Sequence, residues 1–213
     1  MTREEVRDRL IAQRVVPVLR LASADLTERA VGCLADAGFT TVEITMTTPG
    51  AVELIRRLVR SLGPGFLVGA GTVLDPDAAQ RCADAGARFL VSPGIVPGMP
   101  QVARAAGCAA LLGGFTPTEI LTAHREGADI VKVFPASLGG PEYLRAVHAV
   151  FPDILLCPTG GVSLEDMQAY IAAGAALVCV GNNIIDQQAL VAGDTARVTA
   201  HARRFLHPDP AAS

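Results

Sequence analysis

The chain has 213 residues, of which 50% are hydrophobic and 18% are charged, and its net charge is −3. This length and composition supply one large core, and α/β barrels of this size are commonly single domains. The scattered basic residues and an aromatic content of only 4% exclude the charged stripe and the stacking platform that nucleic-acid binding needs.

Membrane and export signals are missing from the sequence. No stretch is long and apolar enough to cross a bilayer, and Met1 to Glu5 lack the apolar core of a signal peptide. The five cysteines are an odd number without close pairing, and we interpret them as small buried hydrophobic residues. We therefore expect a cytoplasmic protein with neither a membrane partner nor a nucleic-acid partner. The cysteines are Cys33, Cys82, Cys108, Cys157 and Cys179.

Taken in chain order, the sequence repeats a unit of one strand and one helix. A short helix is predicted first, over Thr2 to Ala12, with Thr2 as its cap. A strand from Val15 to Leu19 and a helix from Asp25 to Asp36 follow. The further apolar, strand-like runs are Thr41 to Thr45, Phe66 to Ala70, Phe89 to Ser92, Ala109 to Leu112, Ile130 to Phe134, Ile154 to Cys157 and Leu177 to Val180.

The regular alternation of these runs with helical segments indicates a closed parallel barrel. Amphipathic segments of about three turns lie between the runs, which is a typical helix length. The strands are almost continuously apolar, as burial on both faces requires. We predict an α/β fold, a TIM-type (β/α)8 barrel with a short N-terminal helix. Residues 1–206 should form one barrel domain, and residues 207–213 a frayed C-terminal tail.

The predicted strand from Ile130 to Phe134 carries Lys132, the only lysine in the chain. A desolvated lysine can lose its proton near neutral pH and form a Schiff base, whereas arginine stays protonated. A lysine left by chance among arginines would favour a polar face, because lysines avoid full burial unless they are paired. The position therefore favours a catalytic nucleophile, and the alternatives are chance or a buried ion pair.

Side-chain alternation indicates which groups meet inside the barrel. Lys132 shares its side of the strand with Ile130 and Phe134, and Glu43 shares its side with Thr45. If these sides face the barrel axis, an amine and a carboxylate project into one interior. An isolated buried ion pair would add little stability, because desolvation offsets most of the attraction. We therefore favour catalysis, with Glu43 moving protons, over a purely structural pair.

Glycine-rich loops follow the last two predicted strands. Thr159-Gly160-Gly161 and Gly181-Asn182-Asn183 stand where barrels of this type usually bind phosphate. The glycine pair alone is a weak motif, since Ser163 to Asp166 could simply cap the next helix. Its position in the eightfold order favours an anion site. Arg20, after the first strand, is the best side-chain candidate for an anionic end of the substrate.

Motifs spread over almost the whole chain together resemble one enzyme family. They are Pro17-Val18-Leu19-Arg20, Val42-Glu43-Ile44-Thr45, Gly69-Ala70-Gly71-Thr72-Val73-Leu74, Val91-Ser92-Pro93-Gly94, Thr116-Pro117-Thr118-Glu119, Lys132-Val133-Phe134-Pro135-Ala136 and Pro158-Thr159-Gly160-Gly161-Val162. In this order they are similar to the motifs of the 2-keto-3-deoxy-6-phosphogluconate (KDPG) and 4-hydroxy-2-oxoglutarate (KHG) aldolases.

The resemblance implies a class I, metal-independent aldolase without a cofactor, usually a homotrimer. Such an enzyme splits a 2-keto-4-hydroxy acid into pyruvate and an aldehyde, either glyceraldehyde 3-phosphate or glyoxylate. By the resemblance, Lys132 forms the Schiff base, Glu43 moves protons and Thr72 lies near the pyruvyl carboxylate. The other residues that it places in substrate binding are Pro93, Phe134, Thr159, Gly160, Gly161, Gly181, Asn182 and Asn183.

Three positions depart from the family pattern. Thr47 stands where some members carry an arginine, so Arg20 would have to supply that charge from another strand. Gly181-Asn182-Asn183 replaces the usual glycine-glycine-serine and so removes a hydroxyl that could bind phosphate. Leu112 stands where a proline often precedes the glycine after the fifth strand. These departures leave the Schiff-base chemistry intact and leave open whether the substrate is phosphorylated.

Three other functions remain compatible with the sequence. The first is a related enzyme such as 2-keto-3-deoxy-6-phosphogalactonate aldolase. The second is a sugar-phosphate epimerase or decarboxylase in which Lys132 only clamps charge; metal-ligating side chains would then line the strand ends, where the chain has no histidine. The third is a non-catalytic barrel that binds a keto acid and tolerates Lys132→Arg. The histidines are His124, His148, His201 and His207.

Overall fold

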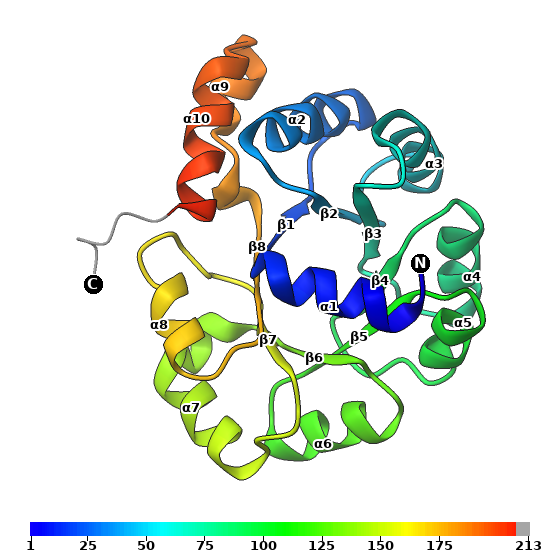
Figure 1. Ribbon diagram of the computed structural model, residues 1–213, viewed down its shortest axis with the longest axis vertical. Helices are drawn as coiled ribbons and strands as arrows, with labels where there is room; N and C mark the ends of the chain where they lie inside the picture. The colour runs from blue at the N-terminus through cyan, green and yellow to red at the C-terminus, as the bar shows by residue number, and fades with distance from the viewer. Residues whose placement is uncertain (208–213) are drawn as a thin grey trace.

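The computed structural model describes residues 1–207, and most of the predicted tail, residues 208–213, lies outside the described residues. Eight parallel strands form one sheet in the order β7-β6-β5-β4-β3-β2-β1-β8. The sheet curls until β7 and β8 meet, where isolated bridges join Leu156 to Ala175 and Thr159 to Cys179. The helices surround this sheet (Figure 1), which confirms the predicted (β/α)8 barrel.

Most elements begin and end close to their predicted bounds. β1 and β2 match the prediction residue for residue, whereas β7 begins at Leu156 instead of Ile154. The strands are β1 (Val15–Leu19), β2 (Thr41–Thr45), β3 (Leu67–Gly71), β4 (Phe89–Val91), β5 (Ala109–Gly114), β6 (Ile130–Val133), β7 (Leu156–Pro158) and β8 (Val178–Val180). The helices are α1 (Arg3–Gln13), α2 (Ala24–Ala37), α3 (Ala51–Leu62), α4 (Pro76–Asp84), α5 (Met99–Ala105), α6 (Pro117–Arg125), α7 (Gly140–Val150), α8 (Met167–Ala172), α9 (Gln187–Ala192) and α10 (Thr195–Leu206), with short 3-10 turns η1 (Ala136–Leu138) and η2 (Asn182–Ile184).

Helix α1 covers the N-terminal end of the barrel (Figure 1). The helix begins at Arg3 because Thr2 caps it: the Thr2 hydroxyl accepts a hydrogen bond from the Glu5 N–H at 3.2 Å, and the Glu5 carboxylate accepts one from the Thr2 N–H at 2.7 Å. Val6 and Leu10 point from α1 into the barrel and are fully buried. This end of the interior is therefore closed by apolar side chains.

Two apolar clusters lie on the two sides of the sheet. One fills the barrel interior, and the other packs between the strands and the surrounding helices. Ile130 belongs to the interior cluster, whereas Val131 and Val133 belong to the outer one. The predicted alternation in β6 is therefore confirmed. The other interior side chains include Val16, Leu67, Phe89, Val91, Leu111, Cys157, Leu177 and Cys179.

Two helices follow the last strand, one more than the eightfold repeat of strand and helix requires. α9 and α10 follow β8, and α10 packs on α2. In Figure 1 this pair, drawn in orange and red, lies beside α2 on the outside of the barrel. Within residues 1–207, no helix is both long enough and apolar enough to cross a membrane.

Candidate active site

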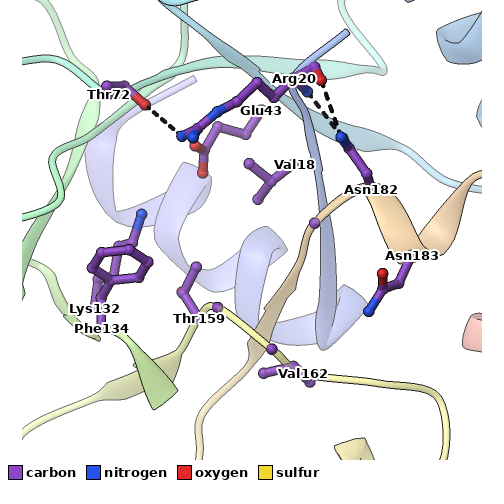
Figure 2. A pocket seen from close by; sticks show the side chains of 13 residues that line it. Val18, Arg20, Glu43, Thr72, Lys132, Phe134, Thr159, Val162, Asn182 and Asn183 are labelled. Carbon is purple, nitrogen blue, oxygen red and sulfur yellow. Dashed lines mark hydrogen bonds between the residues drawn. The ribbon is translucent and has the colours of Figure 1, made fainter. Parts of the chain in front are cut away.

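A cavity of about 350 Å³ opens among the carboxyl ends of the strands, opposite α1. All predicted site residues except Pro93 line it, together with two valines that were not predicted to belong to the site. Figure 2 shows these side chains converging from several strands and the loops that follow them. The lining residues are Val18, Arg20, Glu43, Thr72, Lys132, Phe134, Thr159, Gly160, Gly161, Val162, Gly181, Asn182 and Asn183.

Pro93 lies outside this cavity. It lines a neighbouring hollow of about 280 Å³ after β4 and β5, and Phe134 forms part of the wall of both. Of the two valines, Val18 shares its side of β1 with the interior residue Val16, so side-chain alternation could have identified it. Val162 directly follows Gly160-Gly161 in the loop after β7, and this position is the only feature of the sequence that suggests a place in the site.

Lys132 reaches the cavity from β6. Its neighbours across the register are Gly113 of β5 and Cys157 of β7. The side chain is 6% exposed, and its Nζ atom lies 5.1 Å from the centre of the Phe134 ring. Burial and the neighbouring aromatic ring give the amine largely apolar surroundings. The lysine therefore sits in the apolar, partly closed environment that its proposed chemistry needs.

Glu43 lies opposite, on β2, and is fully buried. Burial raises the pKa of its carboxyl above the ordinary range, and the charges of Lys132 and Arg20 oppose this rise. Neither carboxylate oxygen has a hydrogen-bond partner among residues 1–207. A structural ion pair would satisfy these oxygens, so the geometry favours the catalytic interpretation over the structural one. A carboxyl with a raised pKa suits proton transfer near neutral pH.

Arg20 spans the cavity from the end of β1. Its Nη2 atom donates a hydrogen bond to the Thr72 hydroxyl at 3.4 Å, and its side chain passes beside Glu43 (Figure 2). Thr72 has a φ of 57°, in the left-handed region that a β-branched residue rarely adopts. The backbone after β3 is thus strained where it presents a hydroxyl to the site. The Arg20 guanidinium and the Thr72 hydroxyl together form a donor pair that can bind a carboxylate.

Thr47 does not take part in this arrangement. It is exposed, lies outside the cavity lining, and its hydroxyl shares a hydrogen bond of 2.9 Å with that of Thr45. The Thr45 hydroxyl in turn donates to the Leu19 carbonyl at 3.1 Å. Arg20 therefore supplies the guanidinium that lines the cavity. This agrees with the expectation that Arg20 replaces the arginine that some family members carry at the position of Thr47.

The loop after β7 brings main chain close to the cavity. Gly160 and Gly161 have φ values of 88° and 81°, and a Cβ atom on them would press against Phe134 and Ser137, respectively. Only glycine fits both positions, and backbone amides can then approach an anion. Beyond them, the Ser163 N–H donates to the Asp166 carboxylate at 2.7 Å. Ser163 and Asp166 therefore close a turn before α8, but α8 begins only at Met167 and its N-cap, Asp166, makes no side-chain capping bond, so the predicted cap of a helix from Leu164 is not confirmed.

The loop after β8 places two amide side chains near the cavity. Asn182 accepts a hydrogen bond from the Arg20 N–H at 3.2 Å and donates one to the Arg20 carbonyl at 3.0 Å. Asn183 is exposed and lies on the side of the cavity away from Lys132 and Thr72 (Figure 2). The two neighbouring asparagines therefore have different surroundings, although both were predicted to bind the substrate.

Two thiols lie beneath the cavity. The Sγ atoms of Cys157 and Cys179 are 3.4 Å apart, and the Cys157 sulfur is 3.8 Å from the Thr159 hydroxyl. All five cysteines are buried and free, so their predicted burial is confirmed. Among residues 1–207, no three His, Cys, Asp or Glu side chains gather in a way that could hold a metal ion.

Comparisons with known proteins agree with this geometry. A family model described as KDPG and KHG aldolase matches residues 6–201. The 2-dehydro-3-deoxy-phosphogluconate aldolase of Pseudomonas aeruginosa is 39% identical over 196 residues, which cover 91% of this chain and 88% of that protein. The probable 2-dehydro-3-deoxy-6-phosphogalactonate aldolase of Rhizobium meliloti is 36% identical over 181 residues, with 84% and 85% covered.

A solved structure is similar as well. The KDPG aldolase of Legionella pneumophila, with pyruvate captured as a covalent carbinolamine, superposes with a TM-score of 0.85 at 27% identity and covers 93% of this chain and 97% of that one. The family model spans most of the chain, and two relatives exceed 30% identity over most of their length. The chain therefore belongs to the KDPG and KHG aldolase family.

Proposed function

We propose that this protein is a class I aldolase that cleaves a 2-keto-4-hydroxy acid into pyruvate and an aldehyde through a Schiff base on Lys132. One observation carries the proposal: the only lysine of the chain and the fully buried Glu43 line the same cavity at the carboxyl ends of the barrel strands. Membership of the aldolase family supports it.

The first step forms a covalent bond between Lys132 and the substrate. The neutral amine adds to the C2 ketone, and the resulting carbinolamine loses water to give an iminium. The wall that Phe134 forms over the amine helps to keep bulk water away from this step. Capture of pyruvate as a carbinolamine in the Legionella pneumophila aldolase supports the same step here.

The second step breaks the bond between C3 and C4. Glu43, directly or through a water, takes the proton of the C4 hydroxyl, and the electrons of the broken bond pass into the iminium to form an enamine. The aldehyde leaves, Glu43 helps to return a proton to C3, and hydrolysis frees pyruvate and Lys132. The iminium serves as the electron sink, so we propose that the reaction needs neither a metal nor another cofactor.

The charged ends of the substrate have separate partners. Arg20 and Thr72 would hold the pyruvyl carboxylate beside the amine, since a guanidinium and a hydroxyl are both donors. The opposite end would be bound by the loop amides, which suit a phosphate or a carboxylate. The residues that we assign to this end are Thr159, Gly160, Gly161, Gly181 and Asn183.

KDPG or 4-hydroxy-2-oxoglutarate is the substrate that we propose first, because relatives at 33–39% identity carry these names. A second candidate substrate is 2-keto-3-deoxy-6-phosphogalactonate, since the Rhizobium meliloti relative is named for this compound. We further propose a homotrimer in the cytoplasm, without a nucleic-acid or membrane partner. Five buried free thiols support a reducing compartment.

The function is tested by following pyruvate release from the three candidate substrates. The native chain should cleave at least one of them, and Lys132→Arg should cleave none, although it keeps the positive charge. Pretreatment with a chelator should leave the native rate unchanged. Undiminished cleavage by Lys132→Arg would refute the Schiff-base proposal and would favour a site in which Lys132 only clamps charge.

A further inference from the structure

The oxygen and the nitrogen of the Asn182 side-chain amide both bond to the main chain of Arg20. Its oxygen accepts from the Arg20 N–H at 3.2 Å, and its nitrogen donates to the Arg20 carbonyl at 3.0 Å. The two residues follow β8 and β1, which pair along Val15 to Pro17 with Val178 to Val180. The amide therefore continues the pairing of these strands beyond their ends and ties the two loops together.

Arg20 depends on few other contacts for its position. The residue is exposed, its guanidinium makes a single hydrogen bond, to Thr72, and it forms no ion pair in the part of the chain that the structure describes. A free arginine side chain has many rotamers, and ordering it opposes binding. Fixing the main chain of Arg20 restricts the positions that its guanidinium can reach.

We infer that Asn182 is a positioning residue. Its amide holds the main chain of Arg20 so that the guanidinium reaches the end of the cavity near Thr72. This assignment differs from the prediction that Asn182 binds the substrate. The oxygen and the nitrogen of its amide each already bond to the Arg20 main chain, and these bonds orient the amide toward the loop after β1. The inference rests on the proposed function, in which Arg20 binds the pyruvyl carboxylate.

The absence of a charge at Thr47 makes the position of Arg20 important. Thr47 is uncharged and lies outside the cavity lining, so the carboxylate has one guanidinium available there. Removing the Asn182 amide should free the Arg20 main chain and weaken carboxylate binding equally in the ground state and the transition state. KM should then rise while kcat changes little. With two neutral hydrogen bonds lost, we expect a rise in KM of about tenfold.

A double-mutant cycle distinguishes an indirect role from a direct one. Asn182→Ala, Arg20→Met and the double variant are compared by the KM and kcat of pyruvate release on the substrate that the native chain cleaves best. If Asn182 acts through Arg20, its substitution raises KM about tenfold in the native background and leaves it almost unchanged in the Arg20→Met background. An equal rise in KM in both backgrounds would overturn the inference, because it indicates a direct substrate contact.

Two further variants complete the test. Asn182→Asp keeps an acceptor for the Arg20 N–H and loses the donor to the Arg20 carbonyl. Like Asn182→Ala, it should raise KM in the native background more than in the Arg20→Met background. It replaces Asn182→Ala in the cycle if Asn182→Ala does not fold. Asn183→Ala, one residue further along, should change KM by the same factor in both backgrounds. If its effect also disappears in the Arg20→Met background, the link is not specific to Asn182 and the inference fails.

The proposed function and this inference can fail separately. If Arg20→Met leaves KM unchanged, the carboxylate assignment and the inference are both wrong, although Lys132→Arg still tests the Schiff base by itself. If Arg20→Met raises KM and Asn182→Ala does not, the carboxylate assignment stands and the inference alone is wrong.

Discussion

Gly71 leaves open the space that the carboxyl group of Glu43 occupies. A Cβ atom on Gly71 would overlap the carboxyl carbon and one oxygen of that side chain. Gly71 pairs with Thr45 across β2 and β3, so its open side faces the same interior as Glu43. The Glu43 side chain therefore fits in the barrel because the neighbouring strand has no side chain at this point.

Substitution of Gly71 by alanine should displace the Glu43 carboxyl group. General acid–base catalysis contributes a rate factor of about 10² to 10⁴, so Gly71→Ala should lower kcat by a factor in that range. Steady-state pyruvate release measures the loss, and circular dichroism checks that the barrel is retained. A folded Gly71→Ala protein with native kcat would show that the position of Glu43 does not matter.

Gly32→Ala provides a matched glycine substitution away from the site. Gly32 is exposed within α2, and a Cβ atom there meets no other atom within 4 Å. Alanine loses less conformational entropy than glycine in a helix, so the free energy of unfolding should rise by about 0.5–1 kcal/mol. Urea denaturation measures it, and cleavage rates should remain native. A lower midpoint would contradict the packing of α2.

Glu43→Gln should separate activity from stability. Burial raises the pKa of Glu43, and a carboxyl whose pKa is higher in the folded chain stabilises the fold below its unfolded pKa of about 4.3 and loses that contribution as the pH rises. Glutamine resembles the protonated acid at every pH. The variant should therefore be inactive and more stable than the native chain at pH 7.

The stability difference between Glu43→Gln and the native chain should shrink as the pH falls toward about 4. Thermal unfolding midpoints measured between neutral and acidic pH follow it directly. A difference that stays constant across this range would show that the Glu43 carboxyl has the same pKa in the folded and unfolded chains.

The buried cysteines should react slowly while the chain is folded. Burial raises the pKa of the thiols of Cys82 and Cys108 to about 11 each, so at pH 8 only about one thiol in a thousand is ionised. Ellman's reagent should label them readily in urea, where the unfolded pKa is about 8.5, and hardly at all in buffer. Mass spectrometry of digested, labelled protein assigns each site; rapid labelling of Cys82 in buffer would contradict its burial.

Much of the fold could be predicted because the strands are buried on both faces. The apolar runs around Lys132 and Glu43 gave β6 and β2 directly, and the alternation within them gave the inward direction of both side chains. The repeat predicted one helix after β8, but the presence of two, α9 and α10, was not predicted, because the second falls outside the repeat that identified the barrel.

The contacts between distant segments could not be predicted from sequence patterns. The spacing of Gly71 does not show that its missing side chain makes room for Glu43, and nothing near Asn182 shows that its amide bonds the main chain of Arg20. Pro93 was placed in the site by resemblance, but the wall formed by Phe134 separates it from the main cavity. Such relationships depend on the register and curvature of the closed sheet.

The most direct test of the Schiff-base chemistry is reductive trapping. The protein is incubated with pyruvate and sodium borohydride, digested, and searched by mass spectrometry for a reduced pyruvate adduct. Lys132 is the only lysine, and the other primary amine, at the N-terminus, falls on a different peptide. We predict an adduct on the peptide that contains Lys132; if the protein cleaves its substrate but this peptide stays unmodified, Lys132 is not the nucleophile.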